Sequence, residues 1–354
     1  MDTRINKEKW KLLHEGTVIP AHPLALTKTK ELDERRQRAL TRYYMESGAG
    51  GIAVGVHTTQ FEIREPEINL YETVLRLAAE EVNHASLKKP FLKIAGICGP
   101  TNQALAEAKL AKDLRYDIGL VSMGGLHLTE EEHLIRVKEI ANIMPVFGFY
   151  LQPSVGGRTF SYEFWEQFAE IEGVCAVKMA PFNRYQTLDV VRAVCNSSRV
   201  DEIALYTGND DNIVIDLLTS YQFTVNEKTV TKPIVGGLLG HWAVWTSKAV
   251  QLLEEIKKIR RKEVLPSSIL TTATHVTDSN AALFDASHHY KGCIAGINEV
   301  LRRQGLLSEN TCLSDQERLS PGQSEEINRI YEQYPHLNDD YFVNENLEKW
   351  LLER

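Results

Sequence analysis

The sequence predicts a (β/α)8 barrel followed by a helical C-terminal region. Eight short apolar runs, rich in β-branched residues, recur along the first two thirds of the chain. Their starts lie about 30 residues apart, which is the length of one βα unit. The runs are continuous rather than alternating, as expected of parallel strands buried on both faces. They cover residues 17–22, 51–56, 91–97, 118–123, 146–152, 175–180, 203–208 and 233–237.

Helical patterns separate several of these runs. Residues 32–47 gather apolar and aromatic side chains on one side and stop at Gly48, a common helix-ending residue. Thr129, followed by three glutamates, is a capping box for a helix over residues 129–142. Further helices are expected over residues 102–114, 161–170 and 187–197. An open, doubly wound sheet usually has a Gly-rich turn after its first strand, and residues 20–23 (PAHP) are not such a turn.

Strand patterns end at about Trp245, and the rest of the chain reads as helices. These are expected over residues 247–262, 280–304, 324–333 and 345–352, with a loop at 306–323. No long linker or low-complexity tract separates this part from the barrel. We therefore expect a barrel over residues 1–245, including an N-terminal helical segment, and a helical region over residues 246–354 packed against it.

Composition excludes several classes of protein. The net charge of −8 provides no electrostatic footprint for nucleic acid. No stretch approaches the roughly 18 apolar residues of a membrane span. The first 16 residues are charged throughout, unlike a secretory signal, so we expect a cytoplasmic protein. Five cysteines without a CxxC pair predict reduced thiols rather than disulfides or structural zinc.

Lys178 is the first candidate for chemistry, because reactive side chains of such barrels stand at the carboxyl ends of strands. It lies near the end of the sixth run, among apolar residues. Burial would lower the pKa of its amine, and a neutral amine can form a Schiff base with a ketone. The alternative is a lysine whose amine reaches solvent.

Tyr150, Thr58 and Thr59 stand at the ends of two other strands. The Tyr150 phenol would lie within reach of a molecule bound to Lys178, and the alternative is an aromatic side chain that fills the barrel. The two threonine hydroxyls could bind a ligand, and the alternative is ordinary turn capping.

Three segments around these residues resemble one family. HTTQF at residues 57–61 falls where the family has GTTGE, FYLQP at 149–153 where it has YNxP, and AVK at 176–178 where it has GIK. TGND at 207–210 and the glycines at 236, 237 and 240 resemble two further family turns. The family is that of dihydrodipicolinate synthase and N-acetylneuraminate lyase, Schiff-base (β/α)8 enzymes. The resemblance extends over about residues 15–305.

The resemblance implies a role for each candidate residue. Lys178 would form the Schiff base with a 2-keto acid, such as pyruvate or a 2-keto-3-deoxy sugar acid, and Tyr150 would shuttle the proton. Thr58 and Thr59, with their backbone amides, would hold the keto-acid carboxylate. The remaining substrate-binding residues would be Arg158, Gly208 and Gly237. The reaction would be that of an aldolase or hydro-lyase, without metal or cofactor, in a homodimer or homotetramer.

The departures from the family pattern argue against dihydrodipicolinate synthase activity. Gln60 and Phe61 replace a glycine and a glutamate, and Arg158 follows an insertion at residues 154–157. After the fourth strand the chain reads Met-Gly-Gly at residues 123–125 instead of the relay tyrosines of the synthases. We expect these glycines to leave room for a bulkier substrate.

Two other functions remain open. A metal-dependent barrel enzyme could use His22, His57, His241 and Asp210, although their spacing matches no HxH or HExxH motif. Asp210 and its neighbour Asp211 could instead cap a helix over residues 213–220. The other possibility is a relative that binds a keto acid without turning it over.

Overall fold

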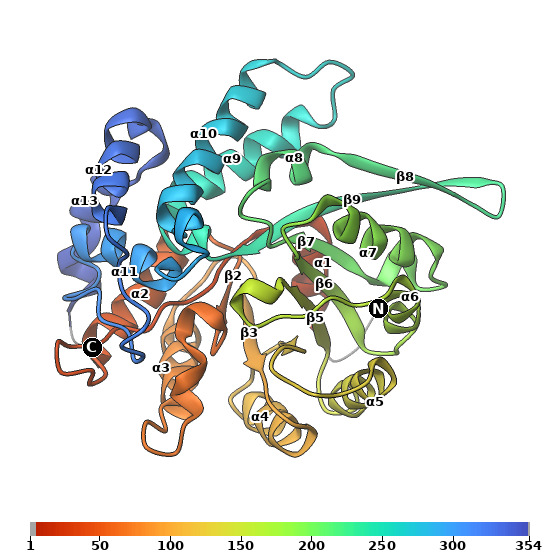
Figure 1. The fold of residues 1–354 in the computed structure, drawn as a ribbon, viewed down its shortest axis with the longest axis horizontal. Coiled ribbons are helices and arrows are strands. Elements are labelled where there is room, and N and C mark those ends of the chain that lie inside the picture. The colour runs from red at the N-terminus through yellow and green to blue at the C-terminus, as the bar shows by residue number, and fades with distance from the viewer. Residues whose placement is uncertain (1–4, 353–354) are drawn as a thin grey trace.

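The computed structural model, which describes residues 5–352, is a closed barrel of eight parallel strands (Figure 1). The strands run in the order β1-β9-β7-β6-β5-β4-β3-β2, and a bridge from Ala21 to Ala53 joins the two ends of this order. The (β/α)8 prediction is therefore confirmed. The parallel strands are β1 (Val18–Pro20), β2 (Gly51–Val54), β3 (Leu92–Ile97), β4 (Ile118–Ser122), β5 (Val146–Leu151), β6 (Val174–Ala180), β7 (Ala204–Thr207) and β9 (Lys228–Leu239).

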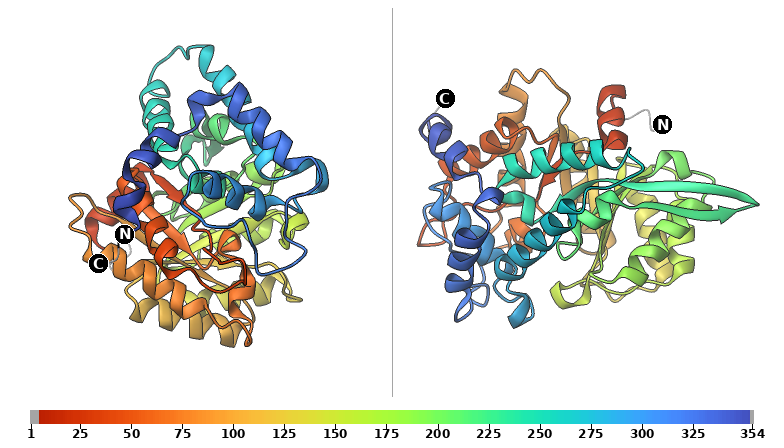
Figure 2. Two further views of the ribbon diagram at one scale, coloured as in Figure 1. Left: turned by 90° about the vertical axis from the view of Figure 1, so that its left-hand side faces the viewer. Right: turned by 90° about the horizontal axis from the view of Figure 1, so that it is seen from above.

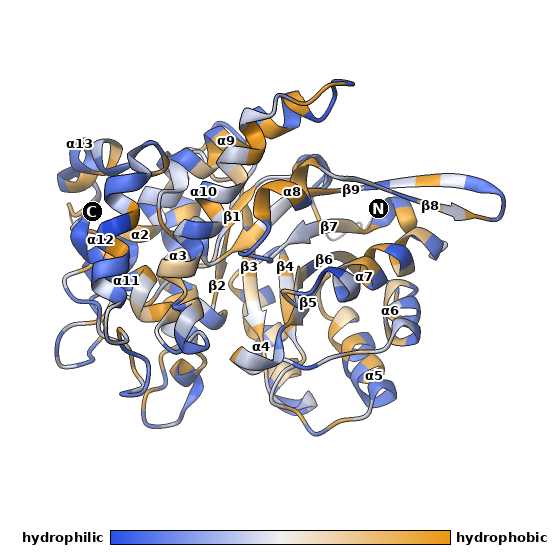
Figure 3. Cartoon of the chain, turned by 45° about the horizontal axis from the view of Figure 1, so that its top comes forward, coloured by the Kyte–Doolittle hydropathy of each residue, from blue (hydrophilic) through white to orange (hydrophobic). Residues whose placement is uncertain are grey.

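A ring of helices surrounds the strands (Figure 1). The Thr129 hydroxyl accepts from the Glu132 amide and the Glu132 carboxylate accepts from the Thr129 amide, so the predicted capping box is present. The ring helices are α2 (Glu34–Glu46), α3 (Tyr71–His84), α4 (Thr101–Asp113), α5 (Glu130–Ala141), α6 (Tyr162–Ala169), α7 (Arg184–Asn196), α8 (Ile213–Leu218) and α9 (Thr246–Ile259). Along α5 and other outer helices hydrophilic and hydrophobic residues lie side by side, as expected of helices with one face on the barrel (Figure 3).

Helix α1 (Lys7–Glu15) packs at the amino-terminal end of the barrel. Its Lys9 pairs with Asp117 just before β4, and the Leu13 carbonyl accepts from the Tyr206 hydroxyl inside the barrel. Because α1 covers the amino-terminal end of the barrel, a functional site is expected at the carboxyl ends of the strands.

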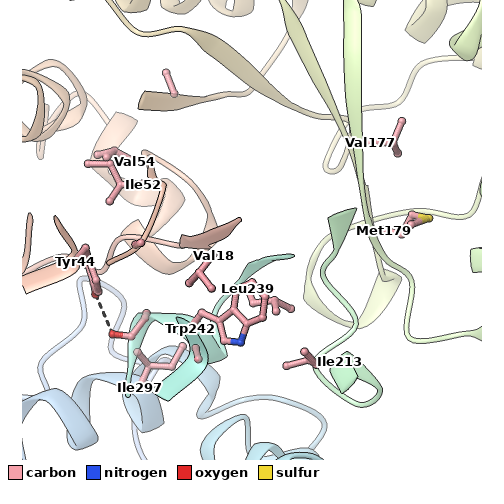
Figure 4. Close-up of a cluster of buried hydrophobic side chains, with 14 of the residues drawn as sticks. Val18, Tyr44, Ile52, Val54, Val177, Met179, Ile213, Leu239, Trp242 and Ile297 are labelled. Carbon is pink, nitrogen blue, oxygen red and sulfur yellow. Dashed lines mark hydrogen bonds between the residues drawn. The ribbon is translucent and has the colours of Figure 1, made fainter. Parts of the chain in front are cut away.

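Side chains on the strands divide into an inner and an outer core, because successive residues point to opposite faces. Phe147, Phe149 and Leu151 of β5 belong to the inner cluster. Val177 and Met179 of β6 belong to the outer cluster, which also contains residues of the surrounding helices (Figure 4). This alternation decides which side chains near the ends of the strands can face a common cavity.

After α9, the rest of the C-terminal region packs beside the barrel, next to α2 and α8 (Figures 1 and 2). Its helices are α10 (Ser268–Leu283), α11 (Cys293–Arg303), α12 (Gln323–Gln333) and α13 (Asp340–Trp350). The expectation of one helix over residues 280–304 is wrong. The chain breaks at residues 284–292, where the backbone of Asp285, His289 and Tyr290 is left-handed. The Asp285 carboxylate holds this turn by accepting from the Gly292 amide and the Ser320 hydroxyl.

An antiparallel hairpin is the largest departure from the predicted strands. β8 (Ser220–Val225) pairs with the first half of β9, so the helix expected over residues 213–220 ends at Leu218 and the eighth strand begins at Lys228. Asn226 and Glu227 form the turn, both with positive φ. The hairpin projects from the barrel as a long arm (Figure 2). Among residues 5–352, no helix combines the length and the hydropathy needed to span a bilayer.

A buried ion pair joins α2 and α3 to the last helix. Arg42 binds Glu81 at 2.7 Å, both side chains about 5% exposed, and its Nη1 donates to the Trp350 carbonyl at the end of α13. We expect Arg42→Met to lower the free energy of unfolding by about 3 kcal/mol, because the buried Glu81 carboxylate loses one of its two guanidinium partners and keeps only Arg38. Urea denaturation measures this loss.

Arg76→Met is the matched control, since Arg76 pairs with Glu80 on the exposed side of α3. It should change the free energy of unfolding by less than about 0.5 kcal/mol. Equal losses in both variants would show that the buried pair contributes no more than a surface pair.

Candidate active site at the barrel mouth

A cavity of about 60 Å³, partly open to solvent, lies at the carboxyl ends of the strands. Barrel residues form its base and sides, including His57, Phe149 and Lys178. The turn after α10 and the first turns of α11 form its roof, with Phe284, Tyr290, Cys293, Ile294 and Ile297. The C-terminal region thus completes the site by covering the barrel mouth.

Lys178 points into this cavity from β6. Its neighbours across the sheet are Phe149 on β5 and Tyr206 on β7, and its Nζ lies 4.1 Å from the centre of the Phe149 ring. A methyl group added at Gly208 would come within 2.5 Å of the Lys178 Cε. Glycine at position 208 therefore gives the lysine side chain the room to reach the cavity.

Burial determines the ionisation of the Lys178 amine. Desolvation lowers its pKa to about 8, although the charge of Asp210 raises it. Burial, aided by the positive charge of Lys178, also lowers the pKa of His57 to about 4, so the imidazole is neutral at pH 7. About a tenth of the Lys178 amine is therefore unprotonated at pH 7, far more than for an ordinary lysine, and the neutral form is the nucleophile.

Asp210 is the acidic group of the cavity. It follows β7, and its Oδ1 accepts a hydrogen bond of 3.3 Å from the His241 amide. Its carbonyl accepts from Asn280 of α10, which ties the loop to the C-terminal region. Burial raises the pKa of the Asp210 carboxyl to about 7, against the lowering effect of Lys178. The caps predicted for α8 are wrong, because Asp211 faces Arg184 instead and neither aspartate side chain caps the helix.

The two threonines after β2 have different positions. Thr58 lines the cavity. Thr59 does not, because its hydroxyl donates to the His22 carbonyl and accepts from the amides of Gly55 and Val56. Its own amide donates to the Val56 carbonyl. Thr59 therefore fixes the turn that carries Thr58 and His57, and the capping alternative describes it.

Tyr150 does not share the cavity with Lys178, which corrects the prediction that it does. Its ring packs 4.9 Å from that of Trp165 on α6, in the outer core, and its hydroxyl lies 3.5 Å from the Phe160 amide. Because side chains alternate along β5, Phe149 faces inward at the position opposite Lys178. The strand's register also shifts between Val146 and Phe147, a feature that the sequence pattern does not show.

Arg158 and Gly237 also lie away from the cavity, contrary to expectation. The Arg158 guanidinium stacks on Phe160 at 4.8 Å, and its Nη1 donates to the Leu128 carbonyl. A methyl group at Gly237 would meet the ring of Trp242 within 2.6 Å, so this glycine allows the tryptophan to pack.

The glycines after β4 do not open the site. A methyl group at Gly124 would lie 2.1 Å from the Gly156 carbonyl oxygen, because the inserted loop after β5 fills the space beside it. The same loop contributes Val155 to the cavity wall. The space beside Gly125 is open, but neither glycine lines the cavity, so the expected room for a bulkier substrate is absent.

Several cavity residues carried no role in the prediction. Tyr290 was expected inside a helix; its hydroxyl instead meets the Gln152 side chain at the roof. Gln60, which departs from the family pattern, accepts from the Leu313 amide and so anchors the C-terminal loop beside the site. Phe182 lines the cavity through a left-handed backbone held by Asn209. Such contacts join segments far apart in sequence, so local patterns do not indicate them.

The alternative metal ligands are dispersed. Both ring nitrogens of His22 are committed, to the Pro23 carbonyl and the Thr41 hydroxyl. The His241 ring lies against Trp245 and is not part of the cavity wall. Across residues 5–352, no group of three or more His, Cys, Asp or Glu side chains is arranged to hold a metal ion.

Solved structures with this fold match nearly the whole chain. Dihydrodipicolinate synthase from Oceanobacillus iheyensis superposes with a TM-score of 0.73 at 16% identity, over 93% of this chain and 99% of its own. N-acetylneuraminate lyase from Fusobacterium nucleatum, solved with pyruvate, gives 0.70 at 16% identity over 92% and 99%. The sequence matches no protein-family model and no curated protein. The structural matches, which are the two kinds of protein that the sequence motifs resemble, establish a common fold.

The effects of burial and of Asp210 on the Lys178 pKa predict how the reactivity of this amine depends on pH. Labelling of Lys178 by acetic anhydride should rise with pH around a midpoint near 8, because only the neutral amine reacts. In Asp210→Asn the midpoint should move lower, since the carboxylate charge no longer favours the ammonium form. Peptide mass spectrometry measures the labelled fraction. A wild-type midpoint near the ordinary lysine value of about 10.4 would contradict this account.

Proposed function

We propose that the protein is a class I lyase, an aldolase or hydro-lyase, that binds a 2-keto acid such as pyruvate as a Schiff base on Lys178. The observation that carries the proposal is the buried Lys178 amine. It lines a cavity at the carboxyl ends of the barrel strands, and burial lowers its pKa to about 8. The common fold with N-acetylneuraminate lyase, which has been solved with pyruvate, supports it.

The first step is condensation. The neutral amine of Lys178 attacks the keto carbon, and the carbonyl oxygen leaves as water after it takes up protons. Thr58 lines the cavity beside His57, and we assign its hydroxyl to donate a hydrogen bond to the keto-acid carboxylate. The resulting iminium withdraws electrons from the adjacent carbon. It therefore stabilises the carbanion that forms when a proton or a carbon–carbon bond is lost there.

Asp210 is the group we assign to proton transfer. It lines the cavity with Lys178, whereas the Tyr150 hydroxyl is buried among the rings outside the barrel. A carboxyl group whose pKa is raised to about 7 can accept and return a proton near neutral pH. As an anion it takes the proton from the carbon next to the iminium and leaves an enamine. In the direction of condensation, the enamine then adds to an aldehyde. In the direction of cleavage, the same enamine forms when the carbon–carbon bond of the lysine-bound adduct breaks.

Reductive trapping tests the Schiff base. Incubation with pyruvate and borohydride should add one reduced pyruvate per chain, on the peptide that contains Lys178. Trapping should accelerate from pH 6 to 9, because the amine becomes neutral over this range. Lys178→Ala should abolish the adduct, as should Lys178→Arg, since guanidinium stays charged. Intact-mass and peptide-mass measurements give both results.

Lys93 provides a matched control. Burial also lowers its pKa to about 8, but its amine donates to Asn83 and does not reach the cavity. Lys93→Ala should therefore keep the adduct. Labelling of a lysine other than Lys178, or an adduct that survives Lys178→Ala, would contradict the proposal.

Deuterium exchange into the methyl group of pyruvate tests the proton carrier. Asp210→Asn should slow this exchange by about 100-fold, because the enamine requires a base, while borohydride still traps the imine. Tyr150→Phe should exchange at the wild-type rate, since its hydroxyl lies in the outer core. Proton NMR measures the exchange. Loss of exchange in Tyr150→Phe with retention in Asp210→Asn would reverse the assignment.

A further inference from the structure

We propose that the site selects a 2-keto acid whose far end is an uncharged, apolar alkyl or aryl group, rather than a hydroxylated or second acidic one. The inference rests on the proposed function, since Lys178 is the point from which the substrate extends. It concerns the part of the cavity beyond the lysine.

The charged side chains of the cavity come from the barrel, and three of the five roof side chains are purely hydrocarbon. His57, Thr58, Lys178 and Asp210 come from the barrel and gather where the keto acid would be bound. The roof provides Phe284, Ile294 and Ile297, all buried or nearly so. Of the cavity-lining residues, all of them within the described part of the chain, Lys178 is the only one that carries a positive charge. The iminium on Lys178 keeps this positive charge and is balanced by the keto-acid carboxylate, so a second carboxylate or phosphate would find no counter-ion in the cavity wall.

Two aromatic rings lie against each other in the cavity wall. Phe182 and Tyr290 meet edge to face, with centroids 5.6 Å apart, and both line the cavity. Both have left-handed backbones, which cost energy in residues other than glycine. Hydrogen bonds hold them: the Phe182 amide donates to Asn209 and the Tyr290 amide to the Asp285 carbonyl. Fixed rings of this kind favour an apolar or aromatic group beside them.

The charges at the outer mouth of the cavity also disfavour an anionic far end of the substrate. Glu62, Glu65 and Glu317 line the adjoining groove, together with Lys291. The Glu317 carboxylate accepts from the amides of Ile294 and Ala295, so the chain's own carboxylate occupies the N-terminus of α11. An anionic far end would meet these carboxylates. A hydroxylated far end would lose its hydration against the roof, where the Tyr290 hydroxyl and the Gln152 side chain already bond each other.

Trapping with three keto acids tests the inference. The probes are pyruvate, 2-oxo-4-phenylbutanoate with an apolar end, and 2-keto-3-deoxygluconate with a hydroxylated end. Half-maximal borohydride trapping on Lys178 should require about tenfold less 2-oxo-4-phenylbutanoate than pyruvate, because the phenyl group is buried. 2-Keto-3-deoxygluconate should require more than pyruvate.

Ile297→Ala should reduce the preference for 2-oxo-4-phenylbutanoate over pyruvate about fivefold, because the roof loses apolar contact area. Ile330→Ala is the matched control: Ile330 is equally buried, in α12, but does not line the cavity, so the ratio should stay as in the wild type.

The outcomes separate the two proposals. If pyruvate is trapped and 2-keto-3-deoxygluconate is preferred, or if Ile297→Ala keeps the wild-type ratio, the apolar inference is overturned and the Schiff base stands. If none of the three keto acids is trapped on Lys178, the proposed function itself is overturned.

Discussion

The burial of one amine is the constraint on which the site depends. Lys178 extends from the middle of a parallel sheet, where a charged ammonium loses its hydration, and this loss keeps part of the amine neutral. Three features surround the Lys178 side chain: Gly208 leaves space for it, the Phe149 ring lies against its amine, and α11 covers the cavity. The Asp285 turn and the Gln60–Leu313 hydrogen bond keep the C-terminal region over the mouth. The helical extension therefore forms part of the cavity and does not only pack against the barrel.

The same low-dielectric environment acts on Asp210 in the opposite direction. Burial raises the pKa of its carboxyl while it lowers that of the amine, so the two groups together favour states in which one proton is shared between them. Such a pair can supply both the nucleophile and the proton acceptor of a Schiff-base reaction. The tyrosine expected for this step instead packs on Trp165, so that in this barrel proton transfer would move from β5 to the loop after β7.

Periodicity was enough to predict the barrel, because each strand, buried on both faces, must be apolar throughout, and the Thr129 cap follows from local chemistry. It also placed Lys178 and Thr58 at the correct edge. It could not assign Tyr150 to a face, since a single residue's shift in register exchanges inside and outside, and β5 is irregular at Val146. The break after Leu283 depends on Asp285 bonding to residues far along the chain, and the β8–β9 turn lacks glycine. Those features arise from tertiary contacts.

A crystal structure of the borohydride-reduced pyruvate complex tests the central claim most directly. We predict continuous electron density from the Lys178 Nζ to the keto carbon, the Asp210 carboxylate facing the methyl carbon, and Tyr150 still packed on Trp165. Pyruvate held elsewhere, without a bond to Lys178, would contradict the account. So would a Tyr150 hydroxyl that has turned into the cavity to contact the adduct.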